Sequence, residues 1–352
     1  MPRITLPMAA GGIFDSWDQT NAGRIKVYWL GDRSSCRPAA AMTPTLSACD
    51  AELHVVAPVS RPGGSSCLID KAGDFSRVLG ADGPVAVVVD PAGQLAAIVP
   101  QPDADSVAAV VQALHDASAP HVVRAQAPVL LIERAVDAEL CEMLIDHWHR
   151  GGKLADGVAS AAGASNVDAD AKRRRDVPVD DKPLFVAVRE ALVRRVVPVI
   201  FRAFQARIVQ IELPRVGCYD AESGGWFRRH RDNTTPFTAH RQFAISVNLN
   251  PTQEYDGGEV RFPEFGRQLY RPPAGGALVF SCSLLHEVNP LRRGRRFGMF
   301  SFLHDESRDA QYRTMLVQQK AKGVLSGIHM RCAAFWLPVL QFFEWAAPIA
   351  VV

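Results

Sequence analysis

Two short stretches decide how this chain is interpreted: GWFRRHRDN at residues 225–233 and HEVNPLRRGRR at residues 286–296. The first contains His-x-Asp, formed by His230 and Asp232. In an extended chain, residues two apart point to the same side, so this imidazole and carboxylate can face a common point. His286 opens the second stretch and can supply a third ligand. Two histidines and one carboxylate can occupy one face of an octahedral metal and leave the opposite face open.

Arg296 lies ten residues after His286, at the start of the next apolar run. Its neighbour Arg295 is expected to point the other way. A guanidinium at this place can hold a carboxylate through two hydrogen bonds at a fixed distance from the metal. Each residue of the set also has a purely structural interpretation, such as an ion pair of Arg296 with Glu259 or Asp305. Those interpretations leave the common spacing unexplained.

The surrounding sequence predicts a β domain. Short apolar runs separated by Gly and Pro recur from residue 208 onward. The expected strands are 208–213, 226–229, 243–249, 258–262, 268–271, 277–280, 284–288 and 297–303. Eight strands at such spacing predict a sandwich or barrel, of which the jelly roll is one form. Helices are expected before it at 137–149 and at 182–204, the second with a kink at Pro198.

These motifs resemble the prolyl-4-hydroxylase-like branch of the 2-oxoglutarate- and Fe(II)-dependent dioxygenases. The resemblance covers residues 208–304, with helical support from about residue 130. Its matching residues are Tyr219, Gly225, Phe227, His230, Asp232, Asn233, Arg241, Ser246, Leu249, Asn250, YDGGE at 255–259, FP at 262–263, PAGGALVF at 273–280, His286, Val288, Pro290, Gly294 and Arg296.

The resemblance implies a double-stranded β-helix with flanking helices and a hydroxylase that releases succinate and CO2. It implies Fe(II) on His230, Asp232 and His286, with 2-oxoglutarate and O2 as cosubstrates and ascorbate as a further reagent. Arg296 would bind the distal carboxylate of 2-oxoglutarate, and Tyr219 would hydrogen-bond the same molecule. Asn248 occupies a cosubstrate-facing position that is often Tyr or Thr in relatives, so its role stays open.

The substrate stays open between a protein side chain and a small molecule, because the fold does not decide it. Substrate contacts are expected from the segments 151–180 and 234–240, which have the composition of loops. Arginines around the ligand-bearing stretches form either a positive rim that attracts anions or an ordinary solvated face. They are Arg228, Arg229, Arg231, Arg292 and Arg293. No spacing links His147, His240 or His304 to the metal set, so structural roles are expected for them.

Residues 1–120 predict a separate α/β domain. Strands are expected at 25–30, 51–57, 85–89 and 94–99, and a helix at 105–117. The order strand, helix, strand, helix, hairpin, helix resembles a thioredoxin- or peroxiredoxin-like fold, in which Cys36 falls near the place of the reactive thiol. The match is degenerate, because no Cys-x-x-Cys occurs and the Pro and Thr that usually precede such a thiol are absent. Activation of Cys36 would need a cation such as Arg33 or Arg37. A module without redox activity that binds a partner or presents substrate is therefore the favoured interpretation.

Composition narrows the partners and the compartment. The 352 residues carry 39 Lys+Arg and 37 Asp+Glu, a net charge of +2, which gives no case for nucleic-acid binding. Seven cysteines are sparse and odd in number, which favours a reducing compartment, and a cytoplasmic location is expected.

Residues 311–352 are expected to form a C-terminal tail. The apolar part of this tail, 333–352, is interrupted by Pro338, Glu344 and Pro348, which argues against a membrane span. Oligomeric state stays open.

Two alternatives to the dioxygenase hypothesis remain. One is a thiol peroxidase that uses Cys36, with the β domain as an accessory. The other is a non-catalytic metal-binding or interaction module. The set of His230, Asp232, His286 and Arg296 argues against the second alternative, because a binding module does not need all four residues.

Overall fold

The computed structural model describes residues 4–18, 20–31, 41–58, 67–78, 83–117, 122, 125–155, 158–159, 165–166 and 171–321. The chain forms two compact units, which divide between Val122 and Val123. Cys36 and residues 322–352 lie outside the described residues, and so does the apolar stretch 333–352. Among the helices that are described, none is long and apolar enough to cross a membrane.

The first unit is built on a five-stranded mixed sheet with the order β5-β4-β3-β6-β7. Strand β3 pairs in parallel with β4 and antiparallel with β6, and β6 and β7 form an antiparallel hairpin. The elements are β1 (Thr5–Pro7), β2 (Ile13–Asp15), β3 (Ile25–Leu30), α1 (Thr43–Ala48), β4 (Ala51–Ala57), β5 (Cys67–Ile69), α2 (Asp74–Val78), β6 (Val85–Val89), β7 (Leu95–Pro100) and α3 (Ala104–Ala117).

Both faces of this sheet are buried, which explains the continuous apolar run of β6 and the burial of every residue of β3. On one face, Val27 and Trp29 pack with Val107 and Val111 of α3. The opposite face carries a second core cluster that includes Tyr28. The four strands and the helix predicted for this region are therefore confirmed. Helices α1 and α2 occupy the two other helix places of the predicted order, and β1, β2 and β5 are additions.

The second unit begins with one strand, three helices and several short strands. They are β8 (Val129–Ile132), α4 (Ala138–Arg150), β9 (Leu154–Ala155), β10 (Val158–Ala159), β11 (Ser165–Asn166), β12 (Lys172–Arg173), β13 (Arg175–Pro178), α5 (Lys182–Arg195) and α6 (Val197–Phe204). The predicted helix 182–204 is interrupted at Val196, which ends α5 and precedes α6. Pro198 lies in the first turn of α6, where a missing backbone N–H costs nothing.

The rest of the second unit is β-rich. Its elements are β14 (Ile208–Ile211), β15 (Arg215–Asp220), β16 (Trp226–His230), β17 (Phe243–Asn248), β18 (Asp256–Gly257), β19 (Val260–Arg261), β20 (Leu269–Tyr270), β21 (Ala277–Ser281), β22 (His286–Val288), β23 (Leu291–Arg293), β24 (Arg295–Asp305) and α7 (Glu306–Ala321). The eight predicted strands are all present with shifted ends. The short strands β18 and β23 are additions. Strands β13 and β15 are additions too, because the polar sequences RDVP and RVGCYD do not show the apolar pattern of a strand.

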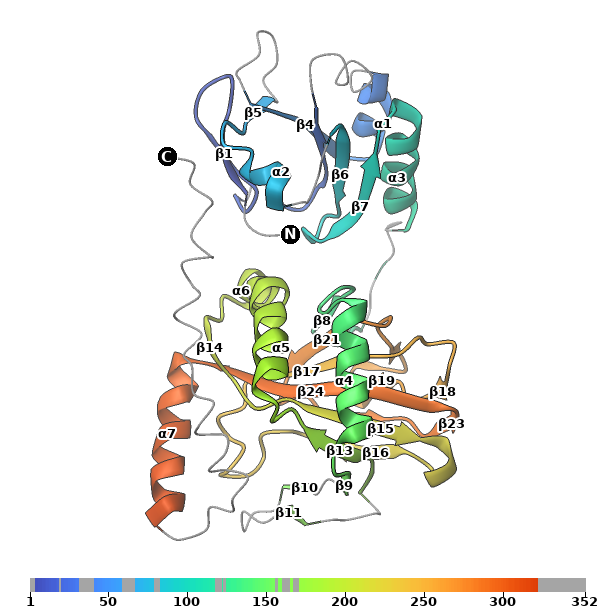
Figure 1. Cartoon of the computed structure of the whole chain (residues 1–352), viewed down its shortest axis with the longest axis vertical. Helices are drawn as coiled ribbons and strands as arrows, with labels where there is room; N and C mark the ends of the chain where they lie inside the picture. The colour runs from blue at the N-terminus through green and yellow to red at the C-terminus, as the bar shows by residue number, and fades with distance from the viewer. Residues whose placement is uncertain are drawn as a thin grey trace. The chain divides into compact units, whose positions relative to one another are not determined.

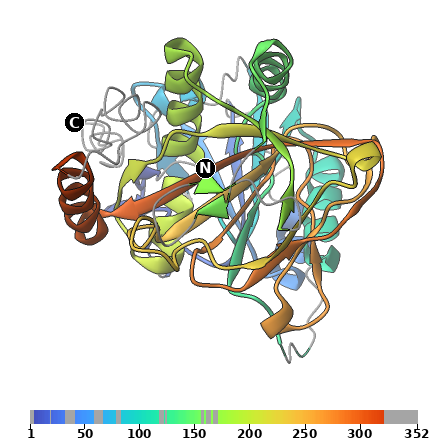
Figure 2. The ribbon, with the colours of Figure 1, turned by 90° about the horizontal axis from the view of Figure 1, so that it is seen from below.

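Two antiparallel sheets organise this β region. The major sheet has the order β8-β21-β17-β24-β15-β13-β9, with β14 also paired to β24, and the minor sheet has the order β12-β16-β22-β19-β20. The chain alternates between them, from β15 to β16, back to β17, on to β19, and then through β21 and β22 to β24. This winding is that of a double-stranded β-helix. The helices α4 and α5 lie on the outside of the major sheet (Figures 1 and 2), where Trp148 of α4 contacts Phe297 of β24.

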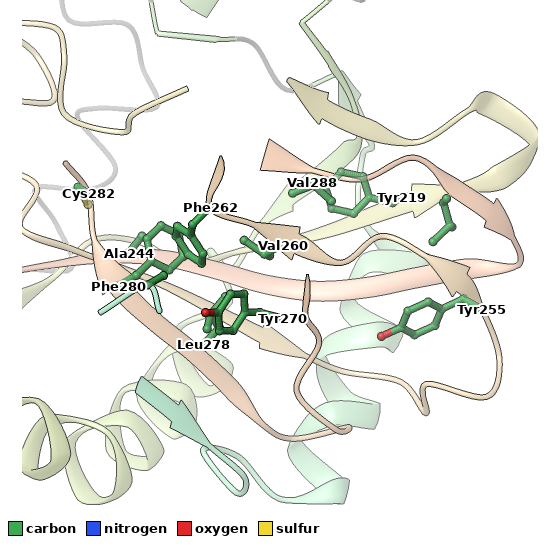
Figure 3. Close-up of a cluster of buried hydrophobic side chains, with 12 residues drawn as sticks. Tyr219, Ala244, Tyr255, Val260, Phe262, Tyr270, Leu278, Phe280, Cys282 and Val288 are labelled. Atoms are coloured by element: carbon green, nitrogen blue, oxygen red, sulfur yellow. The ribbon is translucent and has the colours of Figure 1, made fainter. Parts of the chain in front are cut away.

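The core lies between the two sheets and includes side chains from both (Figure 3). Tyr219, Ala244 and Phe280 come from the major sheet, while Val260 and Val288 come from the minor sheet. Tyr219 and Tyr255 are buried here although each has a hydroxyl group. Buried hydroxyls need hydrogen-bond partners, and those partners belong to the candidate site.

Candidate metal and anion site

His230, Asp232 and His286 come together between neighbouring strands of the minor sheet. His230 ends β16 and His286 begins β22, and the two residues are direct partners in the antiparallel register. Asp232 follows β16, and its backbone N–H donates to the carbonyl of Cys282 at 3.0 Å. One ligand atom from each residue lies within 4.8 Å of the others. The topology thus joins residues that are 56 positions apart in sequence.

Backbone hydrogen bonds orient both imidazoles. Nδ1 of His230 lies 2.7 Å from the carbonyl oxygen of Arg228, and Nδ1 of His286 lies 3.0 Å from that of Leu284. A carbonyl can only accept, so each Nδ1 donates, and in the neutral ring Nε2 then presents a lone pair. The two Nε2 atoms lie 3.4 and 3.5 Å from the two carboxylate oxygens of Asp232. Ligands at neighbouring positions of an octahedral metal lie about 3 Å apart when each bond is about 2.1 Å, so this donor set fits an Fe(II)-type ion.

The protonation states of His286 and Asp232 also favour metal binding. Burial lowers the pKa of His286 to about 4, against the opposing effect of Asp232. Burial alone would raise the pKa of Asp232, but the imidazoles of His286 and His230 bring it down to about 2. At neutral pH the site therefore holds a neutral imidazole at His286 and an ionised carboxylate at Asp232, the forms that bind metal.

Arg296 is almost completely buried, at 2% exposure, and all of its partners are neutral. Its Nε donates to Oδ1 of Asn248 at 2.9 Å, Nη1 to the carbonyl of Gly258 at 2.7 Å, and Nη2 to the hydroxyl of Ser246 at 3.4 Å. Tyr255 also interacts with the guanidinium through its hydroxyl. Among the described residues, no carboxylate forms an ion pair with Arg296, so neither Glu259 nor Asp305 is its partner. A buried cation without a counter-charge is costly, and an anionic ligand would remove that cost.

Asn248 holds Arg296 in place. Its amide nitrogen donates to the hydroxyl of Tyr255 at 2.8 Å and to the carbonyl of Pro272 at 2.6 Å, while its oxygen accepts from Arg296. Gly258 has φ +70°, and a Cβ there would lie 3.1 Å from Cδ of Arg296. The glycine therefore lets its own carbonyl approach the guanidinium closely.

Tyr219 lies on β15, directly opposite Arg296 of β24 in the register. The guanidinium carbon of Arg296 lies 5.7 Å from the centre of the tyrosine ring. The hydroxyl of Tyr219 accepts a hydrogen bond of 3.2 Å from Nη1 of Arg174. Arg174 was missed from the sequence, because KRRRD at 172–176 is charged throughout and does not show that Lys172 and Asp176 are buried while Arg173 and Arg175 are exposed.

Most of the arginine rim is paired. Arg229 pairs with Glu287, Arg231 with Glu264, and Arg292 with Asp256. Arg293 donates to a backbone carbonyl, and Arg295 points outward to Asp220 as expected. These ion pairs favour a solvated face over a free positive rim.

Structural roles were expected for three further histidines, and all three have partners in the protein. His147 contacts the carbonyl of Pro178, His240 contacts Glu212, and His304 contacts Asp309. Their expected structural roles are confirmed. A surface hollow of about 520 Å³ lies along β16 and β22, and neither the metal set nor Arg296 lines it.

Residues 214–304 match the model of the 2OG-Fe(II) oxygenase superfamily. A PKHD-type hydroxylase from Synechococcus sp. is 31% identical over 106 residues, which is 29% of this chain and 46% of the relative, so that match spans less than half the relative's length. PKHD-type hydroxylase PiuC from Pseudomonas aeruginosa is 31% identical over 173 residues, which is 47% of this chain and 73% of the relative.

Among solved structures, a prolyl hydroxylase from Trichoplax adhaerens, in complex with a hypoxia inducible factor peptide fragment, covers 52% of this chain and 86% of its own, with 19% identity and a TM-score of 0.42. The family assignment rests on the sequence matches. The chain therefore belongs to the PKHD-type hydroxylases of the 2OG-Fe(II) oxygenase superfamily.

Proposed function

We propose that this chain is a 2-oxoglutarate- and Fe(II)-dependent hydroxylase. The observation that carries the proposal is the combination of a three-ligand set and a buried guanidinium that has only neutral partners. The three-ligand set fits a divalent iron, and the guanidinium of Arg296 fits the carboxylate of a cosubstrate. Membership of the PKHD-type hydroxylases supports the same reaction class.

In this proposal, His230, Asp232 and His286 bind iron, and the carbonyls that accept from both Nδ1 atoms fix the direction of the imidazoles. Arg296 binds the distal carboxylate of 2-oxoglutarate, and Asn248 and Ser246 fix its guanidinium. The buried aromatic side chains between the sheets exclude water from this region. When bound, iron with 2-oxoglutarate and O2 supplies the oxidation that hydroxylates a C–H bond and releases succinate and CO2.

The substrate class and the cellular location are also proposed. The substrate is a protein side chain or a small molecule, with contacts proposed from 151–180 and 234–240. Of the first segment, 156–157, 160–164 and 167–170 lie outside the described residues. A cytoplasmic location is supported by five free, buried cysteines among the described residues: Cys49, Cys67, Cys141, Cys218 and Cys282.

The first unit is proposed to be a thioredoxin-like domain. Support comes from the parallel β3-α1-β4 unit followed by the antiparallel β6-β7 hairpin and α3. Substituting Cys36 by Ser tests whether this unit has peroxidase activity: unchanged peroxide turnover would exclude a role for this thiol.

The experiment is succinate formation from 2-oxoglutarate by purified protein with Fe(II), ascorbate and O2. His230→Ala should abolish turnover and iron binding. The matched control is His149→Ala, which removes an exposed imidazole on α4 that has ring contacts but no place at the site. If wild-type protein fails to bind both Fe(II) and 2-oxoglutarate, measured directly by titration without O2, the proposed function is wrong.

A further inference from the structure

A second buried guanidinium lies beside the candidate site. Arg174 lies between β12 and β13, and its side chain is 6% exposed. It forms a bidentate ion pair with Asp176, with Nε–Oδ1 and Nη2–Oδ2 distances of 2.6 Å each. The function proposed above does not use this pair.

The pair is fitted against strand β15. Asp176 and Gly217 are direct partners in the register. A Cβ on Gly217 would lie 2.5 Å from Oδ1 of Asp176 and 2.7 Å from Nε of Arg174, so only glycine leaves room for the pair at this position. The guanidinium carbon also lies 4.0 Å from the centre of the Phe300 ring, which places Arg174 over side chains that face the core.

The direction of the hydrogen bond to Tyr219 is fixed by chemistry. A guanidinium has N–H donors and no acceptor, so the Tyr219 oxygen accepts from Nη1 of Arg174. The hydroxyl proton of Tyr219 must then point away from Arg174. In the part of the chain that the structure describes, Tyr219 has no acceptor for this proton, although its side chain is fully buried. The Tyr219 ring lies beside Arg296, the residue proposed to bind a carboxylate.

We infer that Arg174, held by Asp176, is a positioning residue that makes Tyr219 a hydrogen-bond donor to 2-oxoglutarate; this rests on the proposed function. Because Arg174 donates to the phenol oxygen, the O–H of Tyr219 points away from Arg174 and can donate to the bound anion. Without Arg174 the phenol rotates or accepts from another donor, and the contact with the cosubstrate weakens. The residue acts through Tyr219 and does not itself touch the cosubstrate.

A double-mutant cycle tests this coupling. The quantity measured is the Kd of 2-oxoglutarate for the Fe(II)-loaded protein without O2, followed by the visible charge-transfer absorption of the chelate. Tyr219→Phe should raise the Kd about 10- to 100-fold, the range for one hydrogen bond to a charged group. Arg174→Met alone should give most of that increase. In the Tyr219→Phe background, Arg174→Met should change the Kd less than about 2-fold, because coupled residues are not additive.

Two further variants guard against misfolding. Arg174→Gln combined with Asp176→Asn removes both charges of the pair together, so that no buried carboxylate is left without Arg174. Lys172, whose Nζ lies 3.7 Å from Asp176, then keeps an amide oxygen in place of the carboxylate. Gly217→Ala keeps every charge and displaces the pair with one methyl group. Both should raise the Kd as Arg174→Met does, and both should have no further effect when Tyr219 is Phe. Arg175→Met is the matched control, since this neighbouring arginine is exposed and should leave the Kd unchanged.

The outcomes separate the two levels of the proposal. If wild-type protein binds 2-oxoglutarate and the effects of Arg174→Met and Tyr219→Phe multiply, Arg174 does not act through Tyr219 and the inference is wrong. The inference is also wrong if Arg174→Met and Gly217→Ala fold and leave the Kd unchanged. If wild-type protein does not bind 2-oxoglutarate at all, the proposed function itself fails.

Discussion

Arg241 and Arg296 are both enclosed by the second unit, but their surroundings differ. Arg241 forms a bidentate pair with Glu212, with Nε–Oε1 and Nη2–Oε2 distances of 2.9 Å, and His240 contacts the same carboxylate at 2.8 Å. Its side chain keeps 18% exposure. Arg296 is more deeply buried, at 2% exposure, and has no carboxylate partner among the described residues.

This difference indicates that Arg241 has a structural role and that Arg296 can bind an anionic ligand. In the Arg241 region the protein itself supplies the counter-charge, so the network is complete without any ligand. In the Arg296 region only neutral acceptors hold the guanidinium, so a bound anion would supply its counter-charge. Substitutions in the two regions should therefore affect different quantities, one the stability and the other the ligand affinity.

The largest effect on stability is expected from Arg241→Met. It leaves Glu212 without its main partner, which should cost about 3 kcal/mol, near the low end for a buried pair because both side chains keep some exposure. Urea unfolding followed by tryptophan fluorescence measures the loss. Arg241→Met combined with Glu212→Leu should recover much of it. A single variant as stable as wild type would show that the pair is not structural.

Arg296→Met should act on binding. Removing one partner of a buried charge pair costs about 2–5 kcal/mol, so the Kd of 2-oxoglutarate should rise roughly 30-fold or more. Calorimetric titration without O2 measures it, with Fe(II) binding as the control that should persist. The stability loss should be smaller than for Arg241→Met. The opposite pattern, lost stability with intact binding, would reverse the roles of the two arginines.

Acid stability should report on the Arg241 region. Burial alone would raise the pKa of Glu212, but Arg241 and His240 bring it well below its ordinary value of 4.5. A carboxyl with a lowered pKa stabilises the folded state above that ordinary value, and this contribution is lost as the pH falls below it. Glu212→Gln should lower stability at pH 7 by about 1.5–3 kcal/mol, the worth of a hydrogen bond to a charged group, and weaken its fall between pH 5 and 3. An unchanged pH profile of unfolding would contradict this.

Gly258→Ala should weaken the Arg296 region moderately. Left-handed backbone costs an L-residue about 1–2 kcal/mol, and the new methyl group would also crowd Cδ of Arg296. Gly224→Ala is the matched control, because Gly224 has φ +64° but its nearest atom lies 3.5 Å away, on Arg173. Both variants should lose similar backbone stability, and only Gly258→Ala should raise the Kd of 2-oxoglutarate. Equal Kd values would show that this glycine does not help to position Arg296.

The smallest effect is expected at the exposed ion pair of Arg292 with Asp256. Both side chains are solvent-exposed, so screening leaves the pair little strength. Arg292→Ala should leave both stability and the Kd of 2-oxoglutarate unchanged within error. A salt-dependent rise of the Kd in this variant would support the alternative interpretation, in which the arginine rim attracts anions.

Local patterns were enough for much of the second unit. The apolar runs predicted eight of its strands, and two short motifs predicted His230, Asp232, His286 and Arg296. These features depend on neighbours in sequence, through strand alternation and turn residues. In the same way the apolar run of β6 and the turn after it predicted the hairpin of the first unit.

Strands with polar sequences were not predictable in this way. β13 and β15 are held by pairing with residues far along the chain, so their own residues need not alternate between apolar and polar. Tyr219 was proposed for the site from resemblance, while its strand was missed. Arg174 could not be assigned, because nothing local shows that the hydroxyl 45 residues later is its partner.

The sequence by itself determined which residues can bind a metal and an anion, since imidazole, carboxylate and guanidinium have that chemistry wherever they lie. Only the tertiary structure decided that Arg296 has neutral partners and Arg241 has Glu212. It also decided that Asn248 orients Arg296 and that Gly217 makes room for Arg174. Such pairings depend on which strands lie side by side, and contacts between distant segments leave no periodic trace in the sequence.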